Sequence, residues 1–405
     1  MSGRNLGSKI ALYVVCHTEI VPEPQDKQIG LSLRANKRGA VSRAWELLSG
    51  VIDPELRAPI TELGMVEILS ETESAIDLKI KLTIVGCPAA QKIERDARNA
   101  LAKFESISLE MSTMTQAERD QLKSKLRGGK PTRYNPFSQP GNLTQVIFVG
   151  SGKGGVGKST ITANLAVALG QQGFRVGLLD ADIFGYSIPG QLGIKSGPTK
   201  VDDLMLPPIA YDIRVMSIGF FVTDNQPIAW RGPMLHRAIE QFLTDVYWGD
   251  LDYLVVDLPP GTGDVAISLG QLLPGAKSLV VTTPQAAAAT VAERSGAISG
   301  QVGGEVLGVI ENMSFLDTPQ GKLEIFGSGG GQSVADALSQ KNGKPVAVLA
   351  QLPLDTALRE ASDVGEPLVW SHPQNHTAQL ISELARKIAS IPRGLSGKRL
   401  DISLR

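Results

Sequence analysis

The chain has little cysteine: Cys16 and Cys87 are its only two thiols in 405 residues. Two thiols cannot build the disulfide framework of a small secreted domain, and their scarcity fits a reducing compartment, so we expect a cytoplasmic protein. Long apolar runs are missing as well, because none approaches the roughly 20 residues that a membrane-spanning helix needs. The run 10–16 is too short and wrongly flanked for a secretory signal. We expect no membrane partner.

An excess of charge of either sign is also missing. Forty basic residues stand against 41 acidic ones, which gives a formal net charge of −1. The bulk charge therefore indicates neither a nucleic acid nor an anionic membrane as partner. At 42% hydrophobic residues, the chain can fill the cores of one large domain and one smaller one.

Changes in pattern along the chain predict its domain organisation. Residues 1–40 lack a lasting period and are predicted to be a disordered tail. Helical and alternating spacings in 41–112 predict a small α+β domain. Residues 113–141 are rich in glycine, proline and charge, which is typical of a linker. A large domain is predicted at 142–392, and 393–405 form a second tail.

The large domain alternates apolar runs with helical segments. The runs are apolar throughout rather than on every second residue, as in buried parallel strands. They occupy 146–149, 176–179, 254–257, 279–282, 306–310 and 346–349. The pattern predicts an α/β fold with a doubly wound, mostly parallel sheet. Ligands of such sheets bind at the carboxyl ends of the strands, and the polar motifs of this chain begin there.

A glycine loop follows the first of these strands and precedes an alanine-rich helical pattern. Its glycines let backbone N–H groups turn toward an anion, and the helix adds the dipole of its N-terminus. Lys158 is expected to reach the β- and γ-phosphates and Ser159 to bind Mg²⁺. A plain glycine turn between strand and helix is the alternative. The predicted nucleotide-binding residues of the loop are Gly152, Lys153, Gly154, Gly155, Val156, Gly157, Lys158, Ser159 and Thr160.

Carboxylates end two of the other strands. Asp180 and Asp182 follow the run 176–179, and we expect Asp182 to orient the attacking water. Capping of a strand-to-loop junction is the alternative. Asp257 ends the run 254–257 at the Walker B position, where a carboxylate holds Mg²⁺ through water, unless it only closes a turn.

Two later strand ends carry the candidates for base recognition. Asn312 has the donor and the acceptor that an adenine edge requires, although an ordinary Asx turn is an equal alternative. Pro353 and Asp355 follow the last predicted strand and could frame the base as well.

The loop Lys153-Gly-Gly-Val-Gly-Lys-Ser159 has an extra lysine near its start. It resembles the deviant Walker A group that contains MinD, ParA, the nitrogenase iron protein and the Mrp ATPases. The resemblance implies a homodimer in which Lys153 reaches the nucleotide of the partner chain. It also implies Mg²⁺-dependent hydrolysis of ATP in which Lys153, Lys158 and Asp182 take part.

Within that group, the chain resembles the Mrp or ApbC branch of iron-sulfur cluster carriers over most of 143–392. The matching motifs are Asp180-Ala-Asp-Ile-Phe-Gly-Tyr-Ser187, Trp230-Arg-Gly-Pro-Met234, Asp257-Leu-Pro-Pro-Gly-Thr-Gly-Asp264, Glu311-Asn-Met-Ser314, Ile325-Phe-Gly-Ser-Gly-Gly-Gly331 and Pro353-Leu-Asp355. Upstream, Ile52-Asp-Pro-Glu55 and Leu82-Thr-Ile-Val-Gly-Cys-Pro88 resemble the small iron-sulfur assembly domain often fused to these ATPases. Iron-sulfur client apoproteins or assembly factors are the partners that this resemblance implies.

The chain departs from that family at one segment. Many members carry Cys-Pro-x-Cys between Asn-Met-Ser and the glycine run, and two chains then supply four thiolates to a bridging cluster. Residues 315–324 of this chain hold no cysteine. Cys87 remains as a possible cluster-transfer thiol, because an expected helix N-terminus beside it would lower its pKa; a buried structural cysteine is the alternative.

The sequence therefore predicts an ATP-hydrolysing dimer that transfers iron-sulfur clusters or assists their assembly. Two alternatives remain open: a positioning switch of the MinD or ParA type, and a scaffold that nucleotide locks without cluster binding.

Overall fold

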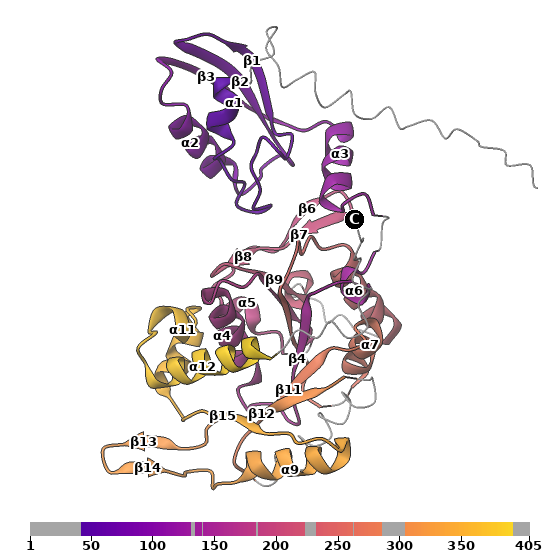
Figure 1. The fold of residues 1–405 in the computed structure, drawn as a ribbon, viewed down its shortest axis with the longest axis vertical. Helices are drawn as coiled ribbons and strands as arrows, with labels where there is room; N and C mark the ends of the chain where they lie inside the picture. The colour runs from indigo at the N-terminus through magenta and orange to yellow at the C-terminus, as the bar shows by residue number, and fades with distance from the viewer. Residues whose placement is uncertain are drawn as a thin grey trace, which may run out of the picture.

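The computed structural model describes residues 42–130, 134–139, 141–183, 185–222, 232–261, 263–285 and 304–391. The predicted tails 1–40 and 393–405, and Cys16 with them, lie outside the described residues. Figure 1 shows a small unit with its own sheet at one end of the molecule and a larger unit with a central sheet below it.

The small unit packs two helices against a three-stranded sheet in the order β1-β2-β3. β2 pairs antiparallel with β1 and parallel with β3. Every second residue of β2 is buried, which is the alternation that the sequence predicted for this segment. The elements are α1 (Arg43–Leu48), β1 (Val66–Glu71), β2 (Ala75–Leu82), α2 (Ala90–Ala100) and β3 (Ser106–Thr113).

The segment predicted as a linker, 113–141, is not irregular throughout. It contains the helix α3 (Gln116–Leu126) and the short 3-10 helix η2 (Pro136–Ser138). Thr115 and Glu118 form a capping box that starts α3, since each side chain bonds the backbone N–H of the other. The glycine and proline residues that suggested a linker all follow α3 in the sequence.

The larger unit is built on an eight-stranded sheet in the order β15-β12-β11-β4-β10-β5-β9-β8. All neighbours are parallel except β8, which pairs antiparallel with β9 at the edge. This confirms the predicted fold class. The strands are β4 (Gln145–Ser151), β5 (Val176–Asp180), β8 (Ile209–Ala210), β9 (Ile213–Ser217), β10 (Tyr253–Asp257), β11 (Lys277–Thr282), β12 (Val306–Glu311) and β15 (Val348–Gln351).

Helices cover both faces of this sheet, which is why its central strands are buried along their whole length. Ile147 and Val149 of β4 pack with α4, α11 and α12, while Val146 and Phe148 pack with α6 and α7 on the opposite face. The helices are α4 (Lys158–Gln171), α5 (Ile188–Gln191), η3 (Ile218–Phe221), α6 (Gly232–Thr244), α7 (Asp264–Leu272), α9 (Gly330–Asn342), α10 (Thr356–Val364), α11 (Leu368–Ser371) and α12 (His376–Ser390).

Two short hairpins were not expected from the sequence. The first joins β6 (Thr199–Val201) to β7 (Leu204–Leu206), and the second joins β13 (Leu316–Thr318) to β14 (Gly321–Leu323). In Figure 1 the β6–β7 hairpin faces the small unit, whereas the β13–β14 hairpin projects from the far end. No helix in the described part of the chain is both long and apolar enough to cross a membrane.

Candidate nucleotide-binding site

The glycine loop joins the end of β4 to the start of α4 at the centre of the sheet. Gly157 caps α4 with φ of 80°, and Gly155 has φ of 79°. Both values lie in the left-handed region that favours glycine, so this chain can make the turn that presents its N–H groups. α4 lacks a side-chain cap at Gly157, which leaves the first N–H groups of the helix available to an anion.

Lys158, Ser159 and Asp257 lie together at the base of the loop. Lys158 Nζ is 2.7 Å from Asp257 Oδ2, and Ser159 Oγ donates to the same oxygen at 2.6 Å. Thr162 Oγ1 donates to Asp257 Oδ1 at 2.8 Å. Asp257 is fully buried and Lys158 is 6% exposed, so each charge is neutralised by the other. Carboxylate and hydroxyl oxygens at this spacing suit a hard cation such as Mg²⁺.

Asp180 lies beside Asp257 on the neighbouring strand and is also fully buried. Its carboxylate accepts hydrogen bonds from Ser217 Oγ at 2.9 Å and from the N–H of Ile188 at 3.3 Å. Burial and the negative charge of Asp257 raise the pKa of Asp180 to about 7. Because its pKa is raised, Asp180 holds a proton far more readily than an ordinary aspartate, while Asp257 forms the ion pair with Lys158.

Asp182 lies two residues beyond Asp180 and lines the cavity above the loop. It is 7% exposed, and its Oδ1 accepts from the N–H of Gly185 at 3.0 Å. The cavity has a volume of about 620 Å³ and is bounded by the loop on one side. Asp182, Gln191, Leu235 and the segment Pro259–Pro260 form other parts of its wall.

A second cavity of about 620 Å³ continues past Gly157 and Thr160 toward the carboxyl ends of β12 and β15. Asn312 and Pro353, both predicted to frame the base, lie in its wall, as does Asp355. Asn312 Nδ2 donates to the carbonyl of Val156 at 2.9 Å, so this side chain also supports the loop. Its Oδ1 is buried without a partner among the described residues, as a site for a ligand amino group requires.

Asp355 has structural bonds of its own. Its Oδ1 caps α10 by accepting from the N–H of Ala357 at 2.8 Å, and its Oδ2 accepts from Thr377 Oγ1 at 2.6 Å. These bonds fix the wall of the second cavity, and they leave Asp355 less free than Asn312 to recognise a base.

Lys153 has a bonding partner outside the Lys158 cluster. Its Nζ donates to Gln285 Oε1 at 2.8 Å, which links the start of the glycine loop to the end of β11. A further bond, from the N–H of Gly261 to the carbonyl of Ser151 at 2.8 Å, links the start of the loop to the segment after β10. The two lysines of the loop therefore have different surroundings.

Cys87 occupies the predicted strand-to-helix junction before α2, but the expected lowering of its pKa is wrong. Its side chain is 5% exposed, and its thiol donates to Glu55 Oε2 at 3.6 Å. Burial, together with the charges of Glu55 and Asp53, raises the pKa of Cys87 to about 11. The N–H of Ala89 works in the opposite direction, and burial outweighs it. The thiol is protonated at neutral pH.

The cysteine-free segment 315–324 contains the whole β13–β14 hairpin. Asp317 pairs with His376 Nδ1 at 2.9 Å, and Lys322 Nζ lies 3.8 Å from the centre of the Phe315 ring. Among the described residues, no group of three or more His, Cys, Asp or Glu side chains could hold a metal ion.

Several site residues escaped the sequence-based prediction. Thr162 lies one helical turn after Lys158, and that spacing was the available signal. Ser217 ends β9, a strand that was not predicted, and Gln285 follows β11 without a motif around it. Gln191 and Leu235 reach the cavity only through the tertiary fold.

A glycine loop, a buried lysine and two strand-end aspartates, all at the carboxyl ends of the central strands of a parallel sheet, define a P-loop NTPase. A family model described as NUBPL iron-transfer P-loop NTPase matches residues 142–389, more than half of the chain. A second model, described as iron-sulfur cluster assembly protein, matches residues 42–127. The chain belongs to the NUBPL iron-transfer P-loop NTPase family, which confirms the resemblance drawn from its motifs.

Curated relatives agree with this assignment. Proteins named iron-sulfur cluster carrier protein from Mycobacterium tuberculosis and Mycobacterium leprae are 49% and 48% identical to the chain over 360 and 373 residues. These matches cover 88% and 91% of this chain and 94% and 97% of the relatives. A solved nucleotide-binding protein from Archaeoglobus fulgidus, in complex with ADP, is 35% identical with a TM-score of 0.49, covering 58% of this chain and 92% of its own.

Proposed function

We propose that this chain is a Mg²⁺-dependent ATPase that acts as a homodimer and delivers iron-sulfur clusters to client apoproteins or assists their assembly. The observation that carries the proposal is the joining, in one chain, of a fully built phosphate site and an N-terminal unit of the iron-sulfur assembly type. The names of the curated relatives support the same cargo.

The side chains of the site have the chemistry that ATP requires. Lys158 would exchange Asp257 for the β- and γ-phosphates, and Ser159 and Asp257 would hold Mg²⁺, which neutralises phosphate charge when bound. The loop N–H groups would bind the phosphates from the opposite side. Asn312 Oδ1 would accept from the adenine amino group, because it is one of the buried acceptors in the wall of the second cavity that lack a partner in the described chain.

Asp182 is suited to orient the attacking water. It faces the cavity just after the end of β5, and its carboxylate accepts a hydrogen bond from the N–H of Gly185. Burial raises the pKa of the neighbouring Asp180 to about 7, which favours its protonated form. The negative charge beside Asp257 is reduced accordingly. Lys153, whose Nζ holds Gln285 in the isolated chain, would exchange that partner for the nucleotide of a second chain.

A steady-state assay tests the ATPase. We expect ATP turnover to require Mg²⁺ and to rise per chain with protein concentration, because Lys153 acts across the dimer. Asp182→Asn should bind ATP with unchanged affinity and hydrolyse it at least about 100-fold more slowly. Turnover that does not depend on concentration, with Lys153→Gln as active as the wild type, would contradict the dimeric mechanism.

Anaerobic reconstitution tests the cargo. The chain is incubated with iron and sulfide, desalted, and analysed for visible absorption, iron and sulfide, and then mixed with an apo-ferredoxin. Transfer to the apoprotein that depends on ATP supports a carrier. A chain that gains no absorption, together with a Cys87→Ser variant that still matures client enzymes, would contradict the carrier proposal and leave a helper without its own cluster.

A further inference from the structure

The β6–β7 hairpin, residues 199–206, is part of the ATPase unit by sequence but is packed into the core of the small unit. Val201, Leu204 and Leu206 are each no more than 2% exposed, and they belong to the same apolar cluster as the buried residues of α1, β2 and α2. Burial of this kind holds the hairpin and the small unit together. A movement of the hairpin therefore changes the contacts of the small unit.

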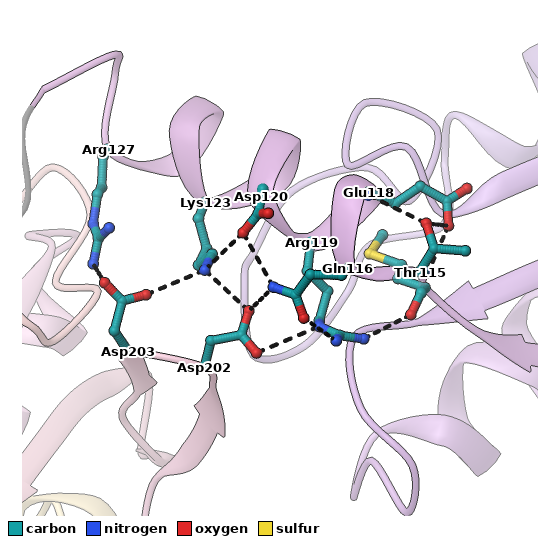
Figure 2. Close-up of polar contacts among 10 residues, drawn as sticks. Thr115, Gln116, Glu118, Arg119, Asp120, Lys123, Arg127, Asp202 and Asp203 are labelled. Atoms are coloured by element: carbon teal, nitrogen blue, oxygen red, sulfur yellow. Dashed lines mark hydrogen bonds and ion pairs between the residues drawn. The ribbon is translucent and has the colours of Figure 1, made fainter.

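Ion pairs between side chains hold the turn of the hairpin against α3. Asp202 and Asp203 form this turn and face the basic side of α3 (Figure 2). Lys123 Nζ lies 3.0 Å from Asp202 Oδ2 and 3.3 Å from Asp203 Oδ1, and Arg127 bonds Asp203 at 2.9 Å. Gln116 Nε2 donates to Asp202 Oδ2 at 3.0 Å. The Lys123 side chain is only 13% exposed, so this network is better shielded than an ordinary surface pair.

The start of the hairpin touches the surroundings of the Cys87 thiol. Thr199 Oγ1 donates to Glu55 Oε1 at 2.6 Å, while Oε2 of the same carboxylate accepts from the Cys87 thiol at 3.6 Å. Glu55 therefore joins a hydroxyl of the ATPase unit to the only described cysteine. Since Thr199 is 8% exposed and Cys87 is 5% exposed, the docked hairpin is part of what covers this corner of the small unit.

Both strands of the hairpin are also tied to the nucleotide cavity. Upstream of β6, the chain passes through Asp182, Gly185 and Gln191, which line the cavity. β7 is bonded to the end of α6: the N–H of Met205 donates to the carbonyl of Asp245 at 2.8 Å. α6 in turn reaches the cavity wall through Leu235. Two separate elements thus connect one hairpin to the walls of one cavity.

We propose that the β6–β7 hairpin couples nucleotide binding in the ATPase unit to access to the Cys87 thiol in the small unit, with Thr199 and Glu55 as the contact between them. The proposal rests on the nucleotide binding of the proposed function and adds a route to the small unit. It does not require that Cys87 bind a cluster.

The geometry also indicates whether bound nucleotide should expose or cover the Cys87 thiol. Bound phosphates would fill the cavity that Asp182 and Gly185 line, and the chain continues from these two residues through α5 to β6. A shift there moves Thr199 away from Glu55 and loosens the cover over Cys87. Nucleotide should therefore expose the thiol.

Alkylation of the full chain tests this. In a Cys16→Ser chain, Cys87 is the only thiol, and its labelling by iodoacetamide at one fixed pH is followed by mass spectrometry without nucleotide, with Mg-ADP and with a non-hydrolysable Mg-ATP analogue. We expect the ATP analogue to speed labelling about fivefold or more, which is the lower range of ordinary coupling between sites. Nucleotide affinity is measured on the same samples, so that a failure to bind is distinguished from a failure to couple.

Variants of the contact separate the hairpin from the rest of the interface. Thr199→Val removes one hydroxyl at nearly constant volume, and Asp202→Asn with Asp203→Asn removes both charges of the turn. Either change should raise the labelling rate without nucleotide and abolish most of the nucleotide effect, with nucleotide affinity unchanged. The matched control is Asp212→Asn, which removes an ion pair with Arg57 at 3.2 Å between the same two units but away from the hairpin. The control should keep the full nucleotide effect.

Three results would overturn the proposal. The first is an unchanged or slower labelling rate at saturating ATP analogue. The second is a full nucleotide effect in both hairpin variants. The third is a loss of the effect in Asp212→Asn equal to that in Thr199→Val, which would assign the coupling to the interface as a whole.

Discussion

Replacing Gly157 by alanine measures how firmly Asn312 supports the phosphate loop. Gly157 has φ of 80°, and a Cβ there would lie 2.4 Å from Asn312 Nδ2. The left-handed backbone costs an alanine about 1–2 kcal/mol. Displacing the amide also breaks its bond to the carbonyl of Val156, worth about 0.5–1.5 kcal/mol. We expect Gly157→Ala to lower the free energy of unfolding by about 2–3 kcal/mol.

Gly155→Ala is the matched control. Its φ is 79°, but nothing lies within 4 Å of its Cβ, so it pays the backbone cost of about 1–2 kcal/mol without the collision. The excess of Gly157→Ala over this control, about 1 kcal/mol, belongs to Asn312. In an Asn312→Ala background the excess should disappear, because the atom that Cβ would meet is gone.

Urea unfolding of the nucleotide-free chain, followed by tryptophan fluorescence, provides the measurement. Of the tryptophans that the structure describes, Trp248 and Trp370 lie in the larger unit and Trp45 lies in the small one, so the signal of the described tryptophans reports mainly on the larger unit. Equal costs for the two glycine variants would refute the reasoning, since the loop would then move freely past Asn312. An excess that persists after Asn312→Ala would refute it as well, because the collision would involve another group.

Three further predictions concern charges and thiols. Asp257→Asn should lower the free energy of unfolding in urea, measured without nucleotide, by about 3 kcal/mol; this is the low end for a broken buried pair, since Asp180 can ionise and partly neutralise Lys158, and unchanged stability would contradict the buried pair. Lys153→Gln should bind ATP within about twofold of wild type in a titration yet hydrolyse it about 100-fold more slowly, and equal turnover would refute its role across the dimer. Because the pKa of Cys87 is raised to about 11, its alkylation in a chain without the other cysteine should rise about tenfold per pH unit from 7 to 10, whereas a plateau near pH 9 would indicate an ordinary thiol.

The centre of the fold could be predicted because its signals are local. A buried parallel strand is apolar at every position, and β4, β5, β10, β11 and β12 all lie where such runs occur. The glycine loop is equally local, since strand, spacing and helix follow one another directly. β9 was missed because Arg214 interrupts its apolar run, and its burial, at 7% exposed, follows from the tertiary fold.

The partners of the site residues could not be predicted in the same way. The sequence was equally consistent with recognition of a base by Asn312 and with an ordinary turn at Asn312. The structure shows a further role, because the Asn312 amide donates a hydrogen bond to the carbonyl of Val156. The two residues are 156 positions apart, and no pattern in either segment indicates the other. Asp355 was recognisable as a polar residue after a strand, but its bond to Thr377 depends on how α12 packs.

At Cys87 a local sequence rule predicted a lowered pKa, whereas the structure raises it. A thiol before a helix is expected to ionise easily, because the helix N-terminus favours a negative charge. The same backbone effect is present here, from the N–H of Ala89, but Glu55 and Asp53 approach from 32 and 34 residues earlier in the chain and the apolar core excludes water. Asp53 is 2% exposed and keeps its place by accepting from the N–H groups of Glu55 and Leu56. The small unit therefore holds its thiol in the unreactive form, and any chemistry at Cys87 first requires that Glu55 move.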